Sequence, residues 1–257
     1  MGLKITIITV CKNSERFLDE TIKSVTKQTY QNIQYIVIDG NSTDNTVDII
    51  KQHSAGIDIW FTEEDSGMYY AINKGLILAT GDYILVLNSD DMLVNECIIQ
   101  QIVDKINEER LDYYYGNIIK TKDGKYKKVK LFDVTYKQLL MSTHGTFVPH
   151  PCFFISAKLN KILDGYDLRY KFASDYDYIL RVLNVTASKG KHINLFVSGF
   201  RIHNNSITAS GKIDEERKKI LKKYGYYQLP YISRLWFYYT LWIYYKIKNL
   251  GEKFTTG

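Results

Sequence analysis

Two adjacent carboxylates, Asp90 and Asp91, follow directly after a hydrophobic run in the segment GDYILVLNSDDML. The run Tyr83–Leu87 is typical of a strand that is buried on both faces of a sheet. Open α/β sheets bind ligands at the carboxyl ends of their strands. One or two carboxylates there can hold a hard divalent ion whose shell is completed by phosphate oxygens and water. The alternative is a turn in which Asp90 or Asp91 caps the following helix.

Three further acids fall at predicted strand ends or helix starts, namely Asp39, Asp65 and Asp175. A carboxylate at Asp39 can accept the ring N–H of a uracil or thymine, and Asp65 can contact the same nucleoside. Asp175 begins a helix, whose dipole keeps the carboxylate ionised, and an ionised carboxylate suits a general base. Taken singly, each of the three can instead be a helix cap or a surface charge.

The elements that must position these acids alternate between strand and helix over about the first 110 residues. Strands are predicted at Lys4–Val10, Ile33–Ile38, Ile57–Phe61 and Tyr83–Leu87. Apolar residues at helical spacing predict helices that include Leu18–Val25, Val47–Ile50, Met68–Ala79 and Ile98–Ile106. Because strand and helix alternate, we expect an α/β fold with a mostly parallel sheet and right-handed crossovers.

The pattern changes after this region. Tyr113–Ile119 and Lys125–Leu131 flank Asp123-Gly124, a dipeptide that is typical of a β-hairpin turn. The chain continues with an apolar run at Cys152–Ile155, an amphipathic helix at Asp175–Leu183 and a strand at Ile193–Phe200. Beyond Asp214 we predict helices, with breaks at Gly225 and Pro230.

Composition and charge narrow the class of protein. The 257 residues are 45% hydrophobic and 24% charged, which is ordinary for a globular protein, although 22 of them are tyrosines. The net charge of +6 is concentrated in a lysine-rich stretch at 120–130 and in the C-terminal region, whereas the first 100 residues are close to balanced. This distribution does not favour nucleic acid as a partner, and the C-terminal bias suits an anionic membrane surface.

The cysteines and the N-terminus indicate a cytoplasmic protein. Cys11, Cys97 and Cys152 are widely spaced, with no C-x-x-C pair and no disulfide framework, so we expect a reducing compartment. The N-terminus MGLKITIITV runs directly into a strand and lacks the features of a signal peptide. No stretch is long and apolar enough to span a bilayer.

The segment Tyr231–Asn249 is extremely aromatic. Its uncharged part, Leu235–Tyr245, would rise only about 16 Å as a helix, against roughly 30 Å of hydrocarbon, so it cannot span a membrane. Tryptophans, tyrosines and the flanking Arg234 and Lys246 suit a helix that lies in the membrane interface. The alternative is a helix that packs on the domain or in a dimer interface.

Four sequence blocks carry a resemblance to a known family. They read ITIITVCKNSERFLDETIKSV, YIVIDGNSTDNTVDII, EDSGMYYAINKGLILATGDYILVLNSDD and FASDYDYILRV, and they extend from Ile5 to Val182. In this order the blocks closely resemble family 2 glycosyltransferases, which transfer sugars from nucleotide donors with inversion. The resemblance implies the GT-A fold, a Rossmann-like three-layer fold with a mostly parallel, mixed central sheet, here followed by C-terminal aromatic helices. It also implies a nucleotide-sugar-binding half at 1–110, an acceptor-binding half at 111–210 and a helical extension at 211–257.

The resemblance further implies roles for individual residues. It implies a nucleoside pocket at Thr9, Val10, Cys11 and Asp39, with Asp65 assisting. The segment Asn88-Ser89-Asp90 stands at the position of the family's D-x-D-type motif, with Asp91 next to it, so Asp90 and Asp91 are the expected ligands of Mn²⁺ or Mg²⁺. Asp175 stands where the family has the base that deprotonates the acceptor hydroxyl.

Three positions depart from the family's pattern. Asn88 replaces the first acid of the D-x-D-type motif, Tyr70 stands where many relatives have an acid, and Ser174 replaces a commoner glutamate. Asp177 is a rival base, but two residues further along a helix it points elsewhere, so we rank it below Asp175.

Two histidines are weaker candidates for the site. His150, between two prolines, and His203 can contact the diphosphate or the acceptor, although lone histidines are more often structural.

By the resemblance to family 2 glycosyltransferases, we expect transfer of a sugar from a UDP-sugar to a lipid-linked oligosaccharide during assembly of a bacterial surface polysaccharide such as O-antigen or capsule. We expect the enzyme to lie on the inner face of the cell membrane, bound through 231–249. Alternatives are a protein or soluble acceptor, or a binding module without catalysis. A homodimer is also possible, and nucleic acid is not an expected partner.

Overall fold

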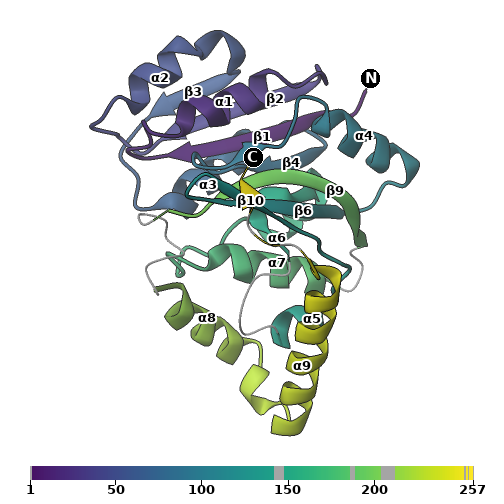
Figure 1. Cartoon of the computed structure of the whole chain (residues 1–257). Helices are drawn as coiled ribbons and strands as arrows, with labels where there is room; N and C mark the ends of the chain where they lie inside the picture. Colours follow the sequence, from purple (N-terminus) through teal and green to yellow (C-terminus); the bar gives the residue numbers. More distant parts are fainter. Residues whose placement is uncertain are drawn as a thin grey trace.

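The computed structural model describes residues 2–141, 148–185, 189–203, 212–251, 253 and 255–256. Within them, one mixed sheet has helices on both faces, and α8 and α9 lie below it in Figure 1. The strands are β1 Ile5–Cys11, β2 Ile33–Asp39, β3 Ile59–Thr62, β4 Tyr83–Val86, β5 Met92–Leu93, β6 Tyr113–Lys122, β7 Lys125–Val129, β8 Phe153–Ser156, β9 Gly190–Arg201 and β10 Thr255–Thr256. The helices are α1 Leu18–Thr26, α2 Thr46–Gln52, α3 Met68–Leu78, α4 Ile98–Glu108, α5 Tyr136–Met141, α6 Ala157–Leu163, α7 Ser174–Asn184, α8 Lys212–Lys223 and α9 Tyr231–Lys248.

The N-terminal half of the sheet is parallel, as predicted. The strands lie in the order β3–β2–β1–β4, and every neighbouring pair among them is parallel. The register pairs Cys11 with Asp39 and Ile8 with Val86. The carboxyl ends of these strands therefore meet at one edge of the sheet, where side chains from separate sequence blocks come together.

The C-terminal half adds antiparallel strands and one long crossing strand. β8 is antiparallel to both β4 and β6, and β7 forms a hairpin with β6. The hairpin turn follows from its sequence, because Asp123 and Gly124 both have positive φ, 49° and 72°, as a two-residue turn of this type requires. β9 runs parallel to β6 and also pairs with the short strand β5, which the sequence pattern did not predict.

The sheet separates two hydrophobic layers. Along β1 the side chains alternate, so that Ile5 and Ile7 lie in one layer while Ile8 and Val10 lie in the other. Helices α1 and α4 cover the first layer, and α3 and α7 cover the second. Both faces of β1 and β4 are buried, which explains why their sequences are continuous apolar runs.

The C-terminal end of α9 and the strand β10 bind to the sheet next to β7. Asn249 exchanges hydrogen bonds with the backbone of Lys130 at 2.9 and 3.1 Å, and β10 pairs with β7. The predicted breaks are confirmed, since Gly225 has a positive φ of 75° after α8 and Pro230 precedes α9. In the described part of the chain no helix is long and apolar enough to cross a membrane.

Candidate functional site

The turn after β4 is held against α1. The Ser89 and Ser14 hydroxyls lie 2.8 Å apart, and the buried Thr21 hydroxyl contacts the carbonyl oxygens of Ser89 and Asp91 at 2.9 and 2.6 Å. These contacts fix the backbone of the predicted D-x-D-type motif. Its side chains are therefore aimed by the α1 packing and not by the turn alone.

Asp90 is partly exposed and contacts His203, which follows β9. His203 Nε2 lies 3.0 Å from Asp90 Oδ2, and the two side chains are 22% and 27% exposed. The pairing of β9 with β6 and β5 brings His203 there, because Ile202 N donates to Thr121 O at 2.8 Å. The structure therefore joins two of the predicted site residues that are 113 positions apart in the sequence.

Asp91 is completely buried behind Asp90. Burial, followed by the charge of Asp90, raises the pKa of the Asp91 carboxyl well above its ordinary value. The Arg201 backbone and the Asn88 side chain oppose this effect. Asn88 Nδ2 lies 3.5 Å from Asp91 Oδ2. Asp91 thus differs from Asp90 in its surroundings, although the two are neighbours in the sequence.

The donor set at this turn fits a divalent ion such as Mg²⁺ or Mn²⁺. Asn88 Oδ1 and Asp91 Oδ1 are buried and have no hydrogen-bond partner among the described residues. Unsatisfied buried oxygens are costly, and oxygen ligands next to a carboxylate and an imidazole suit these ions. Within the described ranges, no group of three or more His, Cys, Asp or Glu side chains is arranged to hold a metal ion.

Asp39 is fully buried at the end of β2, and its carboxylate is occupied by the protein's own donors. Ser42 N lies 3.0 Å and Thr62 Oγ1 lies 2.6 Å from Oδ2. The Ser42 hydroxyl and the Cys11 thiol donate to Oδ1. A nucleobase N–H reaches this carboxylate only by displacing one of these donors, so in this arrangement Asp39 shapes the loop.

The side chains at the end of β1 are buried, so only backbone groups there are available to a ligand. Thr9 is buried and accepts a hydrogen bond from Tyr35 at 3.2 Å, and Val10 lies in the core. Burial, and then the charge of Asp39, raises the pKa of the Cys11 thiol, which therefore stays neutral. Of the three predicted pocket residues in β1, none has an exposed side chain.

Asp65 lies beside the turn that follows Asp39. Its Oδ1 accepts a hydrogen bond from Gly67 N at 2.9 Å. Its Oδ2 lies 2.7 Å from the point that a Cβ on Gly40 would occupy, so a side chain there would displace it. The partly exposed Asp65 and the Asp39–Gly40 turn thus form one acidic corner.

Asp175 stands in the first turn of α7 and is partly exposed. Its Oδ1 accepts hydrogen bonds from the Tyr69 hydroxyl at 3.1 Å and from Tyr176 N at 2.8 Å. Burial, and then the Asp175 charge, raises the pKa of the Tyr69 phenol well above its ordinary value, so Tyr69 keeps its proton and remains a donor. Tyr69 begins α3, which follows β3, so Asp175 also lies at the carboxyl edge of the sheet.

Comparison with known proteins now decides the family. The profile described as glycosyl transferase family 2 matches residues 6–163. The chain belongs to glycosyl transferase family 2. An uncharacterized glycosyltransferase of Mycobacterium tuberculosis is 30% identical over 179 residues, 69% of this chain and 68% of its own length. A PGL/p-HBAD biosynthesis glycosyltransferase of Mycobacterium bovis is 27% identical over 198 residues, 76% of this chain and 75% of its own length.

Solved structures show the fold of this family 2 chain. The crystal structure of S. aureus TarS 1-349 in complex with UDP-GlcNAc matches with a TM-score of 0.71 at 18% identity, over 85% of this chain and 65% of that one. Mannosyltransferase PcManGT from Pyrobaculum calidifontis, in complex with GDP-Man and Mn²⁺, matches with a TM-score of 0.62 at 16% identity, over 81% and 60%. The chain thus spans less than two thirds of either structure, and its own fold is GT-A.

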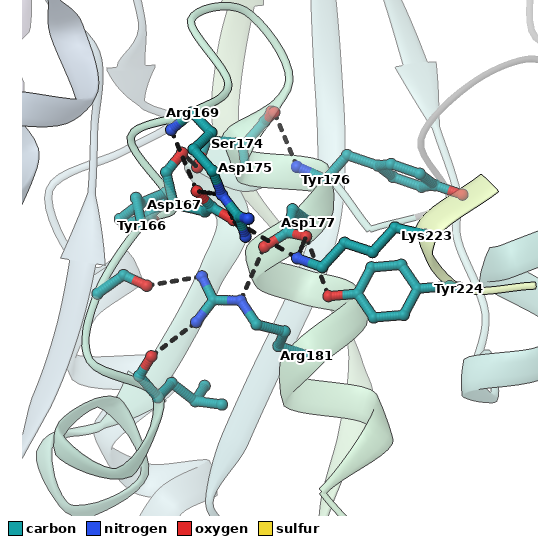
Figure 2. A network of polar contacts seen from close by, with 12 residues as sticks. Tyr166, Asp167, Arg169, Ser174, Asp175, Tyr176, Asp177, Arg181, Lys223 and Tyr224 are labelled. Atoms are coloured by element: carbon teal, nitrogen blue, oxygen red, sulfur yellow. Dashed lines mark hydrogen bonds and ion pairs between the residues drawn. The ribbon is translucent and has the colours of Figure 1, made fainter. Parts of the chain in front are cut away.

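Asp177, the rival base of this family 2 chain, is committed to other contacts. It is fully buried, and its carboxylate lies 2.8 Å from Arg181 Nε, 2.9 Å from Lys223 Nζ and 3.0 Å from the Tyr224 hydroxyl (Figure 2). Arg181 is itself fixed by the carbonyl oxygens of Leu163 and Gly165. Of the two carboxylates, only Asp175 retains access to solvent.

His150 lies beneath the site. It is 8% exposed, and its Nε2 lies 2.6 Å from the Tyr166 hydroxyl. The Tyr166 ring stacks on Tyr69 and Tyr178, with ring centroids 5.5 and 4.3 Å away. Burial lowers the pKa of His150, and Asp175 opposes this in part. His150 therefore supports the tyrosine stack behind Asp175.

The sequence pattern did not predict that several tyrosines gather beside Asp175. A hollow beside Tyr69 is lined by Ser66, Gly67, Met68, Tyr69, Tyr70, Leu168, Tyr170 and Lys171. Tyr70, which departs from the family's pattern, is 39% exposed at this hollow. The high tyrosine content was the available signal, but only the folded chain shows which of the 22 tyrosines gather here.

Proposed function

We propose that this protein is an inverting glycosyltransferase that moves one sugar from a UDP-sugar to a hydroxyl of a lipid-linked oligosaccharide in bacterial surface-polysaccharide assembly. The observation that carries the proposal is that two acidic residues at one edge of the sheet, Asp90 and Asp175, have different surroundings. Asp90 meets His203 at the end of β4, while Asp175 remains accessible beside Tyr69. The family, and neighbours whose structures contain UDP-GlcNAc and UDP, support a UDP-sugar donor.

Asp175 is the base in this proposal. Its carboxylate takes the proton of the acceptor hydroxyl as the hydroxyl oxygen bonds to C1 of the donor sugar, and the C1–O bond to the diphosphate breaks on the opposite face. The Tyr69 hydroxyl donates to Oδ1 and thereby orients the carboxylate toward the acceptor. A base that is already oriented needs little reorganisation in the transition state.

Asp90 and His203 would hold Mn²⁺ or Mg²⁺, with the buried oxygens of Asn88 and Asp91 next to them. When bound, the ion neutralises the charge that develops on the leaving diphosphate. Its charge also favours ionisation of Asp91, whose buried carboxyl otherwise has a raised pKa. In this proposal Asp91 would add a buried carboxylate oxygen to the ion site, while Asp90 carries the more exposed carboxylate.

The nucleoside would bind at the acidic corner formed by Asp65 and the Asp39–Gly40 turn. Backbone groups at the end of β1, from Thr9 to Cys11, border this corner through their register with Asp39. Asp65 presents the partly exposed carboxylate to the nucleoside. Asp39 affects nucleobase binding indirectly, through the loop that its hydrogen bonds with Ser42 and Thr62 fix.

The exposed side chains of α9 support the proposed position on the inner face of the cell membrane. One side of this helix packs on the domain, where Tyr244 meets Phe132 edge to face with ring centroids 4.4 Å apart. Another side exposes large apolar residues, including Trp236 at 61% and Trp242 at 47%. Exposed tryptophans next to basic residues suit the headgroup region of a membrane. The same face fits a second copy of the chain, which is the alternative occupant.

Calorimetric titration tests the donor site first. UDP, GDP and CDP are titrated into the protein with Mn²⁺ and again with EDTA. We expect Mn²⁺-dependent binding that is selective for UDP, followed by hydrolysis of one UDP-sugar out of a panel of UDP-Glc, UDP-Gal, UDP-GlcNAc and UDP-GalNAc. A folded protein that binds none of these nucleotides would contradict the proposal and favour a binding module without this chemistry.

A further inference from the structure

A glutamate on α8 binds the backbone of the segment that leads into the helix of Asp175. The Glu216 carboxylate accepts hydrogen bonds from three consecutive backbone N–H groups, those of Lys171 at 2.8 Å, Phe172 at 2.7 Å and Ala173 at 3.0 Å. These residues lead directly into α7, which begins at Ser174. The three donors converge on one side chain that lies more than 40 positions away in the sequence.

The local sequence does not supply a cap for α7. The N-cap residue of α7 is Ala173, which has no polar side chain, and α7 has no side-chain cap of its own. N–H groups at a helix N-terminus need acceptors, and a carboxylate there also interacts favourably with the helix dipole. Glu216 instead accepts the N–H groups of the three residues that precede Ser174, and as a result the segment that enters α7 depends on where α8 lies.

α8 holds the same helix at further points. Lys223 and Tyr224, at its C-terminal end, bind the buried Asp177 (Figure 2). The Arg217 guanidinium lies over the Tyr176 ring, 5.0 Å from the centroid. Asp175 therefore lies between a backbone segment held by Glu216 and two neighbours, Tyr176 and Asp177, that α8 also contacts.

Asp175 itself has few contacts that would fix its position. Within the described part of the chain, its carboxylate accepts hydrogen bonds from the Tyr69 hydroxyl at 3.1 Å and from the backbone N–H of its own neighbour Tyr176. The placement of its carboxylate is consequently set by the backbone of 171–177. A misplacement of about 1 Å in a reacting group can cost on the order of 100-fold in rate.

We propose that Glu216 is a positioning residue of the transfer reaction, which holds the backbone of 171–173 and so places Asp175 against the acceptor hydroxyl. This inference rests on the proposed role of Asp175 as the base. Glu216 acts through the segment that it binds, and the same segment forms one wall of the hollow at Tyr170 and Lys171.

The test compares substitutions at Glu216 with a matched control on the same helix. Glu216→Ala removes all three acceptor bonds. In Glu216→Gln the amide oxygen can keep the two bonds that converge on Oε2, while the amide NH₂ faces the N–H of Lys171. Glu215→Ala removes a neighbouring exposed charge of the same sign. Asp175→Asn serves as the reference for loss of the base.

Two measurements separate positioning from folding. One is the affinity for UDP in the presence of Mn²⁺, measured by calorimetry. The other is kcat and KM for hydrolysis of a UDP-sugar, with water as the acceptor. The substrate is the UDP-sugar that the wild-type protein hydrolyses fastest. For Glu216→Ala we expect kcat to fall roughly 10- to 100-fold while donor KM and UDP affinity stay within about twofold. Glu216→Gln should lie between this variant and the wild type, and Glu215→Ala should match the wild type.

The outcomes distinguish this inference from the proposed function. Normal turnover in Glu216→Ala, together with lost turnover in Asp175→Asn, overturns the positioning role and leaves the base in place. Normal turnover in Asp175→Asn overturns the base and, with it, the inference about Glu216. A parallel loss of UDP affinity and kcat in both Glu216 variants also overturns positioning, since Glu216 would then support the fold as a whole.

Discussion

Replacing Asp177 by asparagine should destabilise the protein strongly without removing the donor site. The Asp177 side chain is 0% exposed, whereas its partners Arg181 and Lys223 are 20% and 34% exposed. Asparagine keeps the shape of aspartate but removes the charge, and its NH₂ group faces donors. Two cations then remain next to a neutral group in a largely buried setting.

The expected size of the effect follows from this exposure. Breaking a buried ion pair by removing one partner costs about 3–5 kcal/mol. Because Lys223 can turn toward water, we place the loss at the lower end, about 3 kcal/mol. For a chain of this size that loss corresponds to a fall in Tm of about 6–12 °C. The Lys223→Met change should cost less, because it leaves Asp177 with Arg181 and Tyr224.

Urea denaturation at neutral pH measures this loss, and the melting temperature gives an independent value. Asp48→Asn is the matched control, since Asp48 forms an exposed i,i+3 pair with Lys51 in which the side chains are 67% and 59% exposed. This control should change the free energy of unfolding by less than about 0.5 kcal/mol. A double change at Asp177 and Lys223 should cost less than the sum of the two single changes.

One result would refute the reasoning. If Asp177→Asn unfolds within about 1 kcal/mol of the wild type, the contacts with Arg181 and Lys223 are not a stabilising network. If the folded variant instead loses hydrolysis while it keeps its stability and its affinity for UDP, Asp177 takes part in the chemistry.

Three further predictions test other parts of the structure. Asp90→Ala should abolish Mn²⁺-dependent binding of UDP, and unchanged affinity by calorimetry would exclude Asp90 as a metal ligand. Replacing Trp236 and Trp242 by serine should release the protein from phosphatidylglycerol vesicles in a sedimentation assay. The control Ile162→Ser, which changes an exposed apolar residue on α6, should leave vesicle binding unchanged. If the tryptophan variant still sediments with the vesicles, these two tryptophans are not the membrane contact. Burial lowers the pKa of His150 in the folded protein. Below the pKa of about 6.5 that histidine has in the unfolded chain, the unfolded chain therefore binds a proton that the folded chain does not. The free energy of unfolding should consequently fall as the pH drops. His150→Gln should flatten this loss between about pH 7.5 and 5.5 in urea denaturation, and an unchanged pH dependence would contradict the assignment.

Local structure was largely predictable, because it depends on side chains that are close in the sequence. The parallel strands β1, β2 and β4 lie within a few residues of their predicted bounds, and the Asp123-Gly124 turn has the backbone that its residues require. β3 begins two residues later than expected, because Ile57 ends a 3-10 turn and does not join the sheet. The connection between the last two helices, α8 and α9, also begins and ends near the predicted glycine and proline.

The site was predictable as a set of residues but not as an arrangement. Asp90 and Asp91 are equivalent in the sequence pattern, yet the fold exposes one and buries the other. The sequence predicts Asp39 as a ligand for a nucleobase but could not predict that Ser42 and Thr62 donate hydrogen bonds to its carboxylate. Burial and hydrogen-bond competition depend on neighbours from other strands, and no local pattern contains that information.

The sequence by itself determined the strand and helix pattern, the acids at the ends of the strands and the family. These features rest on periodicity, turn chemistry and residue type, all of which act over short distances along the chain. Only the tertiary structure decided that His203 meets Asp90, that Asp177 is buried in a network and that Glu216 binds the segment that leads into the helix of Asp175. Such contacts join residues many positions apart, and they form only when the packing of the sheet and helices brings those residues together.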